Sequence, residues 1–137
     1  MPWTVDYSEH DVISLLIVGR QSFGDVIEET AAIVAEMERH RCNRVLVDCT
    51  RTRIALSTAE IYRVQDVYRD LGVPLRSQFA ILLPAELPTH ELHAYEFHEL
   101  VSRNRGYHVR LFRERSEAMA WLGARVLDSK ASDDSLS

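Results

Sequence analysis

Short, almost wholly apolar runs alternate along the chain with longer stretches in which apolar residues recur every three or four positions. The short runs are typical of buried strands, and the three-to-four spacing is typical of amphipathic helices. Strands are predicted at 5–7, 12–19, 44–48, 79–83 and 108–112. Helices are predicted from Ser22 to about Arg41, from Ser57 to Leu71, from Pro88 to about Arg105, and from Ser116 onward.

Local signals support the helix ends. Ser22 precedes Asp25 by three residues and Ser57 precedes Glu60 by three, which is the spacing of a capping box. Gly72 follows the second predicted helix, as is common where a helix ends.

The order of the elements predicts the fold class. Two strands around a polar turn at 8–11 come first, and single helices then alternate with single strands. This order predicts a single-domain α/β sandwich with four helices and a mostly parallel five-stranded sheet that has an antiparallel edge strand. We place the domain at residues 1–127 and predict that the polar residues 128–137 form a disordered tail.

Composition excludes several classes of protein. The 137 residues carry a formal net charge of −5, whereas binding to nucleic acid needs a clustered basic surface. No apolar run approaches the ~20 residues of a membrane span. The first residues lack the basic and apolar regions of a signal peptide, so we expect a cytoplasmic protein with reduced thiols at Cys42 and Cys49.

Two stretches carry a resemblance to a known family. RVLVDCTRTRIALSTAE at 44–60, followed by YHVRLFRERSEAMAWL at 107–122, resembles the STAS-like (SpoIIAA-like) family of small bacterial proteins. FAILLP at 79–84 and the segment 94–97 also look like that family's third strand and third helix. The resemblance covers about residues 3–123 and implies a fold related to anti-sigma-factor antagonists and to the STAS domains of anion transporters.

The resemblance also implies a function. STAS domains are binding modules, and in the antagonists a partner kinase phosphorylates a serine at the start of a helix. Ser57 is the nearest positional match here. We therefore expect a non-enzymatic regulatory or binding protein that recognises a protein partner through residues 50–62, with a switch at Ser57 or Thr58. The oligomeric state stays open, with a homodimer as one alternative.

The chemistry of this segment allows two interpretations of Ser57. In one, Ser57 and Glu60 only cap a helix. In the other, a phosphate on Ser57 meets the free N–H groups of the helix start, and Arg51 and Arg53 pair with its charge. Asp48 ends a predicted parallel strand, as in phospho-accepting receiver domains, but the other strand ends lack the acidic residues and lysine of such sites. We expect Asp48 to cap the loop or to bind a backbone amide.

Apolar residues in predicted loops suggest a second function. Ile54, Leu56 and Leu87 would be costly to expose unless they cover the core or a ligand, and Tyr62 and Tyr95 are expected near them. The alternative function is therefore a carrier of a small apolar ligand, such as a lipid or fatty acyl chain.

The predicted third helix carries several titratable residues. They are His90, His93, His98, Glu91, Glu96 and Glu99. Their spacing lacks a His-Glu-x-x-His order, so an enzyme or metal site on this helix is the weakest alternative. We expect a polar helical face at the surface, with no metal, no cofactor and no catalysis.

Overall fold

The computed structural model describes residues 2–8 and 10–123, so the predicted tail at 128–137 lies outside the described residues. The elements, in chain order, are β1 (Trp3–Ser8), β2 (Val12–Gln21), α1 (Phe23–His40), β3 (Arg44–Ile54), α2 (Thr58–Asp70), β4 (Gln78–Leu82), α3 (Thr89–Asn104), β5 (His108–Phe112) and α4 (Arg115–Leu122). Among the described helices, none is long and apolar enough to cross a membrane.

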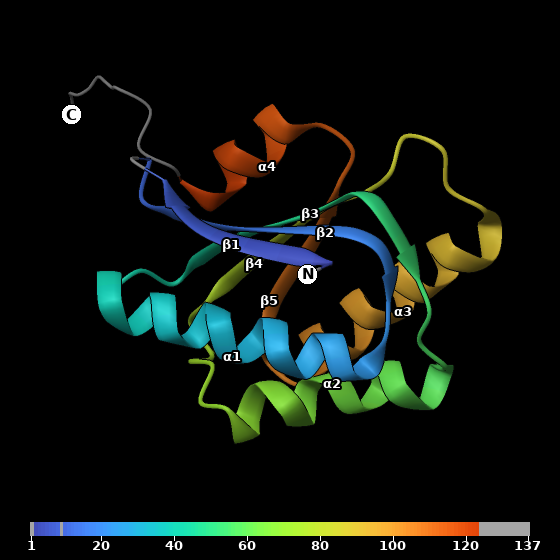
Figure 1. Cartoon of the computed structure of the whole chain (residues 1–137), viewed down its shortest axis with the longest axis horizontal. Helices are drawn as coiled ribbons and strands as arrows, with labels where there is room; N and C mark the ends of the chain where they lie inside the picture. Colours follow the sequence, from blue (N-terminus) through green and yellow to red (C-terminus); the bar gives the residue numbers. More distant parts are fainter. Residues whose placement is uncertain (1, 9, 124–137) are drawn as a thin grey trace.

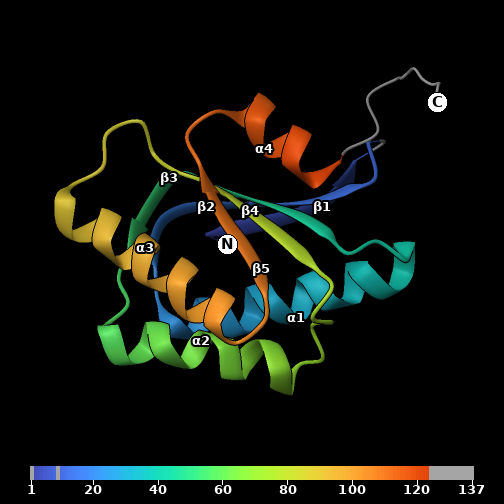
Figure 2. The same ribbon diagram turned by 180° about the vertical axis from the view of Figure 1, so that it is seen from behind.

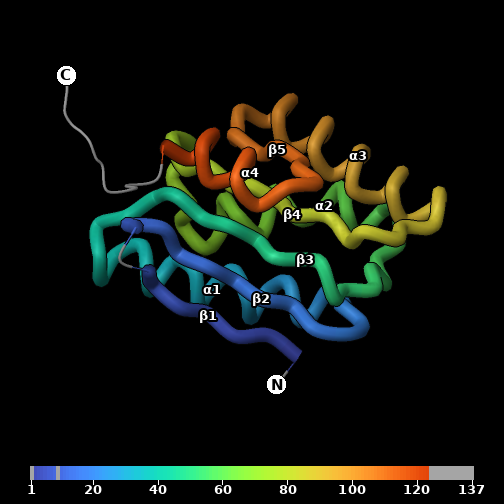
Figure 3. The backbone as a smooth tube through the Cα atoms, turned by 90° about the horizontal axis from the view of Figure 1, so that it is seen from above, coloured from blue at the N-terminus to red at the C-terminus, as the bar shows by residue number. Residues whose placement is uncertain are grey.

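The five strands form one sheet in the order β1-β2-β3-β4-β5. Strand β1 pairs antiparallel with β2, and the other neighbours are parallel. The strands lie side by side in chain order when the molecule is seen from above (Figure 3). The structure therefore confirms the predicted α/β fold with its antiparallel edge strand and four helices.

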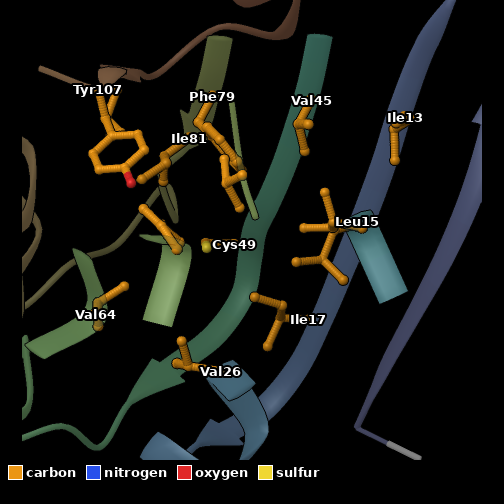
Figure 4. Packing of buried hydrophobic residues seen from close by; sticks show 14 of the residues in the cluster. Ile13, Leu15, Ile17, Val26, Val45, Cys49, Val64, Phe79, Ile81 and Tyr107 are labelled. Atoms are coloured by element: carbon orange, nitrogen blue, oxygen red, sulfur yellow. The ribbon is translucent and has the colours of Figure 1, made fainter. Parts of the chain in front are cut away.

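The helices cover the two faces of the sheet unequally. α1, α2 and α3 lie on one face, and α4 lies alone on the other (Figures 1 and 2). The larger core cluster lies between the sheet and the three helices, with Cys49 among the aliphatic side chains of β2 and β4 (Figure 4). The smaller core cluster joins α4 to the sheet and consists of Val12, Leu46, Ala80, Leu82, Ala118 and Leu122.

Several element boundaries differ from the prediction by one or two residues, and the end of β3 differs by six. The apolar pattern predicts that β3 ends at Asp48, but the strand continues to Ile54 because its second half pairs with Val18–Gln21 of β2. The added segment alternates threonine and arginine, a pattern without the apolar run that marks a buried strand. The last helix is predicted to start at Ser116, but it begins at Arg115 with Glu114 as its N-cap residue.

The smaller core cluster indicates that the packing of α4 on the sheet depends on one leucine, Leu122. Leu122 is 1% exposed, so Leu122→Ala should lower the free energy of unfolding by about 3–5 kcal/mol, through lost apolar contacts and the cavity left behind. Leu100→Ala is the matched control, because Leu100 is 57% exposed and should change stability by less than about 0.5 kcal/mol. Urea denaturation measures both; similar losses in the two variants would contradict the assigned packing.

Candidate functional site: the end of β3, the start of α2 and an internal cavity

Ser57 is the N-cap residue of α2 and forms the predicted capping box. Its hydroxyl accepts a hydrogen bond from the backbone N–H of Glu60 at 3.1 Å, and the Glu60 carboxylate accepts one from the backbone N–H of Ser57 at 2.9 Å. Ser57 and Thr58 are both exposed. The Ser57 hydroxyl therefore has a structural partner and belongs to an exposed residue.

Asp48 lies on the other face of the sheet from Ser57. Side chains alternate along a strand, and Leu46, two residues earlier, belongs to the smaller core cluster under α4. The Asp48 carboxylate accepts hydrogen bonds from the Thr50 backbone N–H at 3.0 Å and from Arg115 at 2.7 Å. Burial opposes its ionisation, but the hydrogen bonds from Thr50 and Arg115 outweigh burial and hold the pKa of Asp48 below its usual value. Asp48 thus binds a backbone amide and fixes the start of α4.

The register of β2 and β3 shifts between Leu16 and Val18, as at a β-bulge. The Thr52 hydroxyl donates a hydrogen bond to the Ile17 carbonyl at 2.9 Å. A side chain thus bonds to a backbone carbonyl at the point where the register shifts. Thr52 is buried, while Arg51 and Arg53 on either side of it are exposed. Bulges commonly redirect side chains near functional sites, and this one presents two arginines outward from a paired strand.

A buried carboxylate that the sequence pattern places at the surface fixes the end of β3. Glu91 in the first turn of α3 is 2% exposed. It accepts hydrogen bonds from the Ile54 backbone N–H at 3.2 Å and from Arg53 at 2.9 Å. An acidic residue in a first helical turn is explained by the helix dipole alone, so no local signal marks this contact between distant segments.

His98 also corrects the expectation of a fully exposed polar face on α3. It lies between α2 and α3, with a ring nitrogen 3.3 Å from the Tyr68 hydroxyl and the other nitrogen 3.3 Å from the Gln65 amide. Burial lowers the pKa of His98 to about 4, so the ring is neutral at pH 7. His90 and His93 are exposed. Across residues 2–8 and 10–123, no three His, Cys, Asp or Glu side chains converge as metal ligands would.

Three of the five predicted pocket residues come together, and the other two lie elsewhere. Ile54, Leu56 and Tyr95 line one cavity of about 70 Å³ between the sheet and α1, α2 and α3. Tyr62 is 53% exposed and lies outside this cavity, with the Arg105 guanidinium over its ring at 5.3 Å. Leu87 lines a shallow depression beside Arg53 and Glu91. Only the first three are brought together around an internal space.

Most of the cavity wall is apolar, but several polar side chains also face it. They are Gln21, Glu29, Thr30, Cys49, Tyr68, Tyr95 and His98. Sequence reasoning missed Glu29, although it lies three residues after Val26 and four before Ile33 in the inward stripe of α1. A carboxylate at a core position of an amphipathic helix is a signal that could have identified it.

Glu29 is held in the neutral form at pH 7. It is 3% exposed, and its Oε1 atom accepts a hydrogen bond from the Gln21 side-chain amide at 2.9 Å. Burial raises the pKa of Glu29 to about 8, against the opposing effect of the Gln21 bond. Burial also raises the pKa of the Cys49 thiol to about 12, so Cys49 is a neutral thiol and a poor nucleophile.

Solved structures give the fold an identity. SpoIIAA, an anti-sigma factor antagonist in its unphosphorylated form, aligns with a TM-score of 0.50 and 11% identity over 88% of this chain and 97% of its own. An uncharacterized protein of the DUF3478 family from Shewanella loihica PV-4, with a SpoIIAA-like fold, aligns with a TM-score of 0.55 and 16% identity over 88% and 91%. No protein-family model and no curated protein matches the chain. The chain therefore has the SpoIIAA-like, or STAS-like, fold.

The Glu29 carboxyl predicts a specific dependence of stability on pH. Because folding raises its pKa from 4.5 to about 8, its contribution is fully present below about pH 4.5 and is lost as the pH rises to about 8. Relative to Glu29→Gln, the free energy of unfolding of the unmodified protein should fall by up to ~1.4 kcal/mol per pH unit across this window. Urea denaturation at several pH values measures the difference. Glu28→Gln, at an exposed neighbouring position, is the control and should keep the original slope; parallel profiles for Glu29→Gln and the unmodified protein would contradict the assignment.

The Glu91 contacts predict a local loss of protection. Glu91→Ala leaves the Ile54 N–H without its acceptor and should lower the free energy of unfolding by about 1–3 kcal/mol. Hydrogen exchange at the Ile54 amide should accelerate, because that bond would no longer protect it. Glu96→Ala removes an exposed carboxylate from the same helix and should change neither quantity. Unchanged exchange at Ile54 in Glu91→Ala would show that the contact does not hold the strand end.

Proposed function

We propose that this chain is a non-enzymatic regulatory protein that recognises a protein partner through residues 50–62. The observation that carries the proposal is an exposed hydroxyl at a fixed helix start, next to a strand end with two outward arginines. Backbone pairing with β2 and the Glu91 contact hold that strand end in place. A surface that is already ordered loses little conformational entropy on binding, which favours recognition.

The fold likeness supports the same proposal. SpoIIAA, whose fold this chain shares, is an anti-sigma factor antagonist, and its similar structure is that of the unphosphorylated form. An antagonist of another protein is a regulator, and an unphosphorylated form implies a phosphorylated counterpart. In the present chain, Ser57 is the exposed hydroxyl at the start of α2 and Thr58 is its exposed neighbour.

Phosphorylation of Ser57 would change this surface by simple electrostatics. A phosphate brings about −1.5 to −2 charges to a position where the Glu60 carboxylate now accepts a bond from the Ser57 N–H. The two anions repel, while the free N–H groups of the first turn attract the phosphate. The proposed result is that the phosphate adds negative charge at the start of α2 and that the Glu60 carboxylate moves away from the Ser57 N–H. The rest of α2 stays in place.

A second candidate function is ligand binding in the internal cavity, favoured by its apolar walls. An engineered cavity of about 150 Å³ admits a benzene ring, and this cavity is about half that size. A fatty acyl chain would therefore require α1, α2 and α3 to move away from the sheet, whereas a molecule of a few non-hydrogen atoms would not.

The partner proposal is tested by site-specific crosslinking in the native host. A photo-crosslinker at Thr58 should capture a protein partner, and the same group at exposed Leu100 on α3 should not. The captured partner is then titrated against the unmodified protein, Ser57→Asp and Ser57→Ala. Ser57→Asp should change its affinity by about tenfold or more relative to Ser57→Ala, because charge-assisted hydrogen bonds contribute about 1.5–3 kcal/mol.

Different outcomes contradict different parts of the proposal. If Ser57→Asp and Ser57→Ala bind the partner with equal affinity, the phosphorylation switch is excluded, but partner recognition through residues 50–62 is not. Crosslinks from Leu100 in place of Thr58 would exclude the surface itself. Asp is as good an N-cap residue as Ser, whereas Ala removes the cap and costs about 0.5–2 kcal/mol, so an amide spectrum first shows that each variant is folded.

A further inference from the structure

Two polar atoms in the internal cavity have no nitrogen or oxygen partner within hydrogen-bond distance in the part of the chain that the structure describes. They are Oε2 of Glu29 and the hydroxyl oxygen of Tyr95, and each of these residues is only 3% exposed. An unpaired buried polar group costs about 1–3 kcal/mol, so native proteins rarely leave one without a function or a bound molecule. Both residues line the same cavity, although they come from α1 and α3.

Both atoms belong to hydrogen-bond donors. The Gln21 amide already occupies Oε1 of Glu29, so the proton of the neutral carboxyl is on Oε2. Tyr95 keeps its phenolic proton at pH 7, because burial raises its pKa further above the ordinary value. The Cys49 thiol also interacts with the Tyr95 hydroxyl, but a thiol sulfur is only a weak acceptor. The cavity therefore presents two O–H donors that lack a strong acceptor.

The rest of the lining restricts the ligand further. No lysine or arginine is among the lining residues, and the two groups whose pKa values lie nearest to 7, Glu29 and His98, are both uncharged at pH 7. An anion would lose its hydration without gaining a cation, so a charged ligand is unfavourable here. The remaining walls are aliphatic and aromatic, and they suit small alkyl groups.

We propose that this cavity binds a small neutral molecule with a carbonyl group, whose oxygen accepts hydrogen bonds from both Tyr95 and Glu29. A phenol and a neutral carboxylic acid in an apolar site form a known arrangement for holding a carbonyl or enolate oxygen. The volume of about 70 Å³ suits a ketone, amide or ester with few non-hydrogen atoms. The side chains of Ile54, Leu56 and Ile61 line this cavity, whereas the exposed side chains of the same segment form the proposed partner surface, so the two sites share a segment but not a surface.

The groups facing Glu29 give the proposal a dependence on pH. Burial raises the pKa of Cys49 on β3 to about 12 and raises that of Tyr68 on α2 above its ordinary value, and it lowers that of His98 on α3 to about 4. The carboxylates of Asp25 and Glu28 on α1 add to the effect of burial on Glu29. Among these lining groups, Glu29 is thus the one that changes charge between about pH 6 and about pH 10, where it would lose the proton it donates.

The experiment uses acetone labelled with ¹³C at its carbonyl carbon and titrates it into the full chain near pH 6. Saturable binding should shift the carbonyl resonance from its position in water, because the donors that bond to the oxygen change, and should perturb the methyl resonances of Leu15, Ile17 and Ile33. Tyr95→Phe and Glu29→Leu should each weaken binding by about tenfold, the effect of one lost hydrogen bond. Glu29→Gln keeps an N–H donor and should retain affinity within about twofold.

The pH series and a matched control complete the test. Binding to the unmodified protein should weaken above about pH 8, whereas binding to Glu29→Gln should stay constant. Ser77→Ala removes another unpaired buried hydroxyl that does not line the cavity and should leave acetone binding unchanged. A two-dimensional amide spectrum of each variant shows that it is folded before its titration is interpreted.

Two results would overturn the proposal. If acetone shows no saturable shift while the amide spectrum is native, the cavity holds water or nothing. If acetone binds but Tyr95→Phe and Glu29→Leu leave its affinity unchanged, and xenon perturbs the same methyl groups equally, the cavity is a general apolar void without the assigned recognition.

Discussion

Strand β3 pairs with β2 on both sides of a shift in register, and the rest of the structure depends on this pairing. Before the shift β3 also pairs with β4, and after it the strand leads to α2, so the helix start follows an ordered strand. Side chains alternate between the two faces of a strand, so one inserted residue reverses the face on which all later side chains of that strand lie. Asp48 faces α4 and binds Arg115, Cys49 lies in the larger core (Figure 4), and Thr52 faces inward and completes the hydrogen bonding of Ile17.

Two buried glutamates show how differently a core can treat the same functional group. Glu91 accepts bonds at both oxygens, from Ile54 and Arg53, and serves to fix the strand end. Glu29 accepts a bond at one oxygen only, and the protein keeps it neutral. A fully partnered buried group makes a structure more specific, whereas a partly partnered one carries a free-energy cost that a bound molecule could remove.

Local features of the sequence predicted much of this protein. Apolar runs and helical spacing located the strands and helices, and the Ser57 capping box followed from residues three positions apart. These features depend on contacts between near neighbours in the chain, for which sequence spacing is sufficient. The resemblance in 44–60 and 107–122 also indicated the correct fold, although the identity to similar solved structures is only 11% and 16%.

Tertiary structure alone decided the chemistry of the candidate sites. The sequence pattern places Glu91 and His98 on a surface face of the third helix and ends β3 at Asp48. Both predictions fail for the same reason, because no residue nearby in the chain indicates the distant segments that these residues contact. The pattern also groups Tyr62 and Leu87 with Tyr95, yet only Tyr95 faces the cavity. The sequence by itself determined the elements and their order, since these follow from local spacing. Packing of α1, α2 and α3 on the sheet determined which polar groups are buried and which of them have partners, because those contacts join residues far apart in the chain.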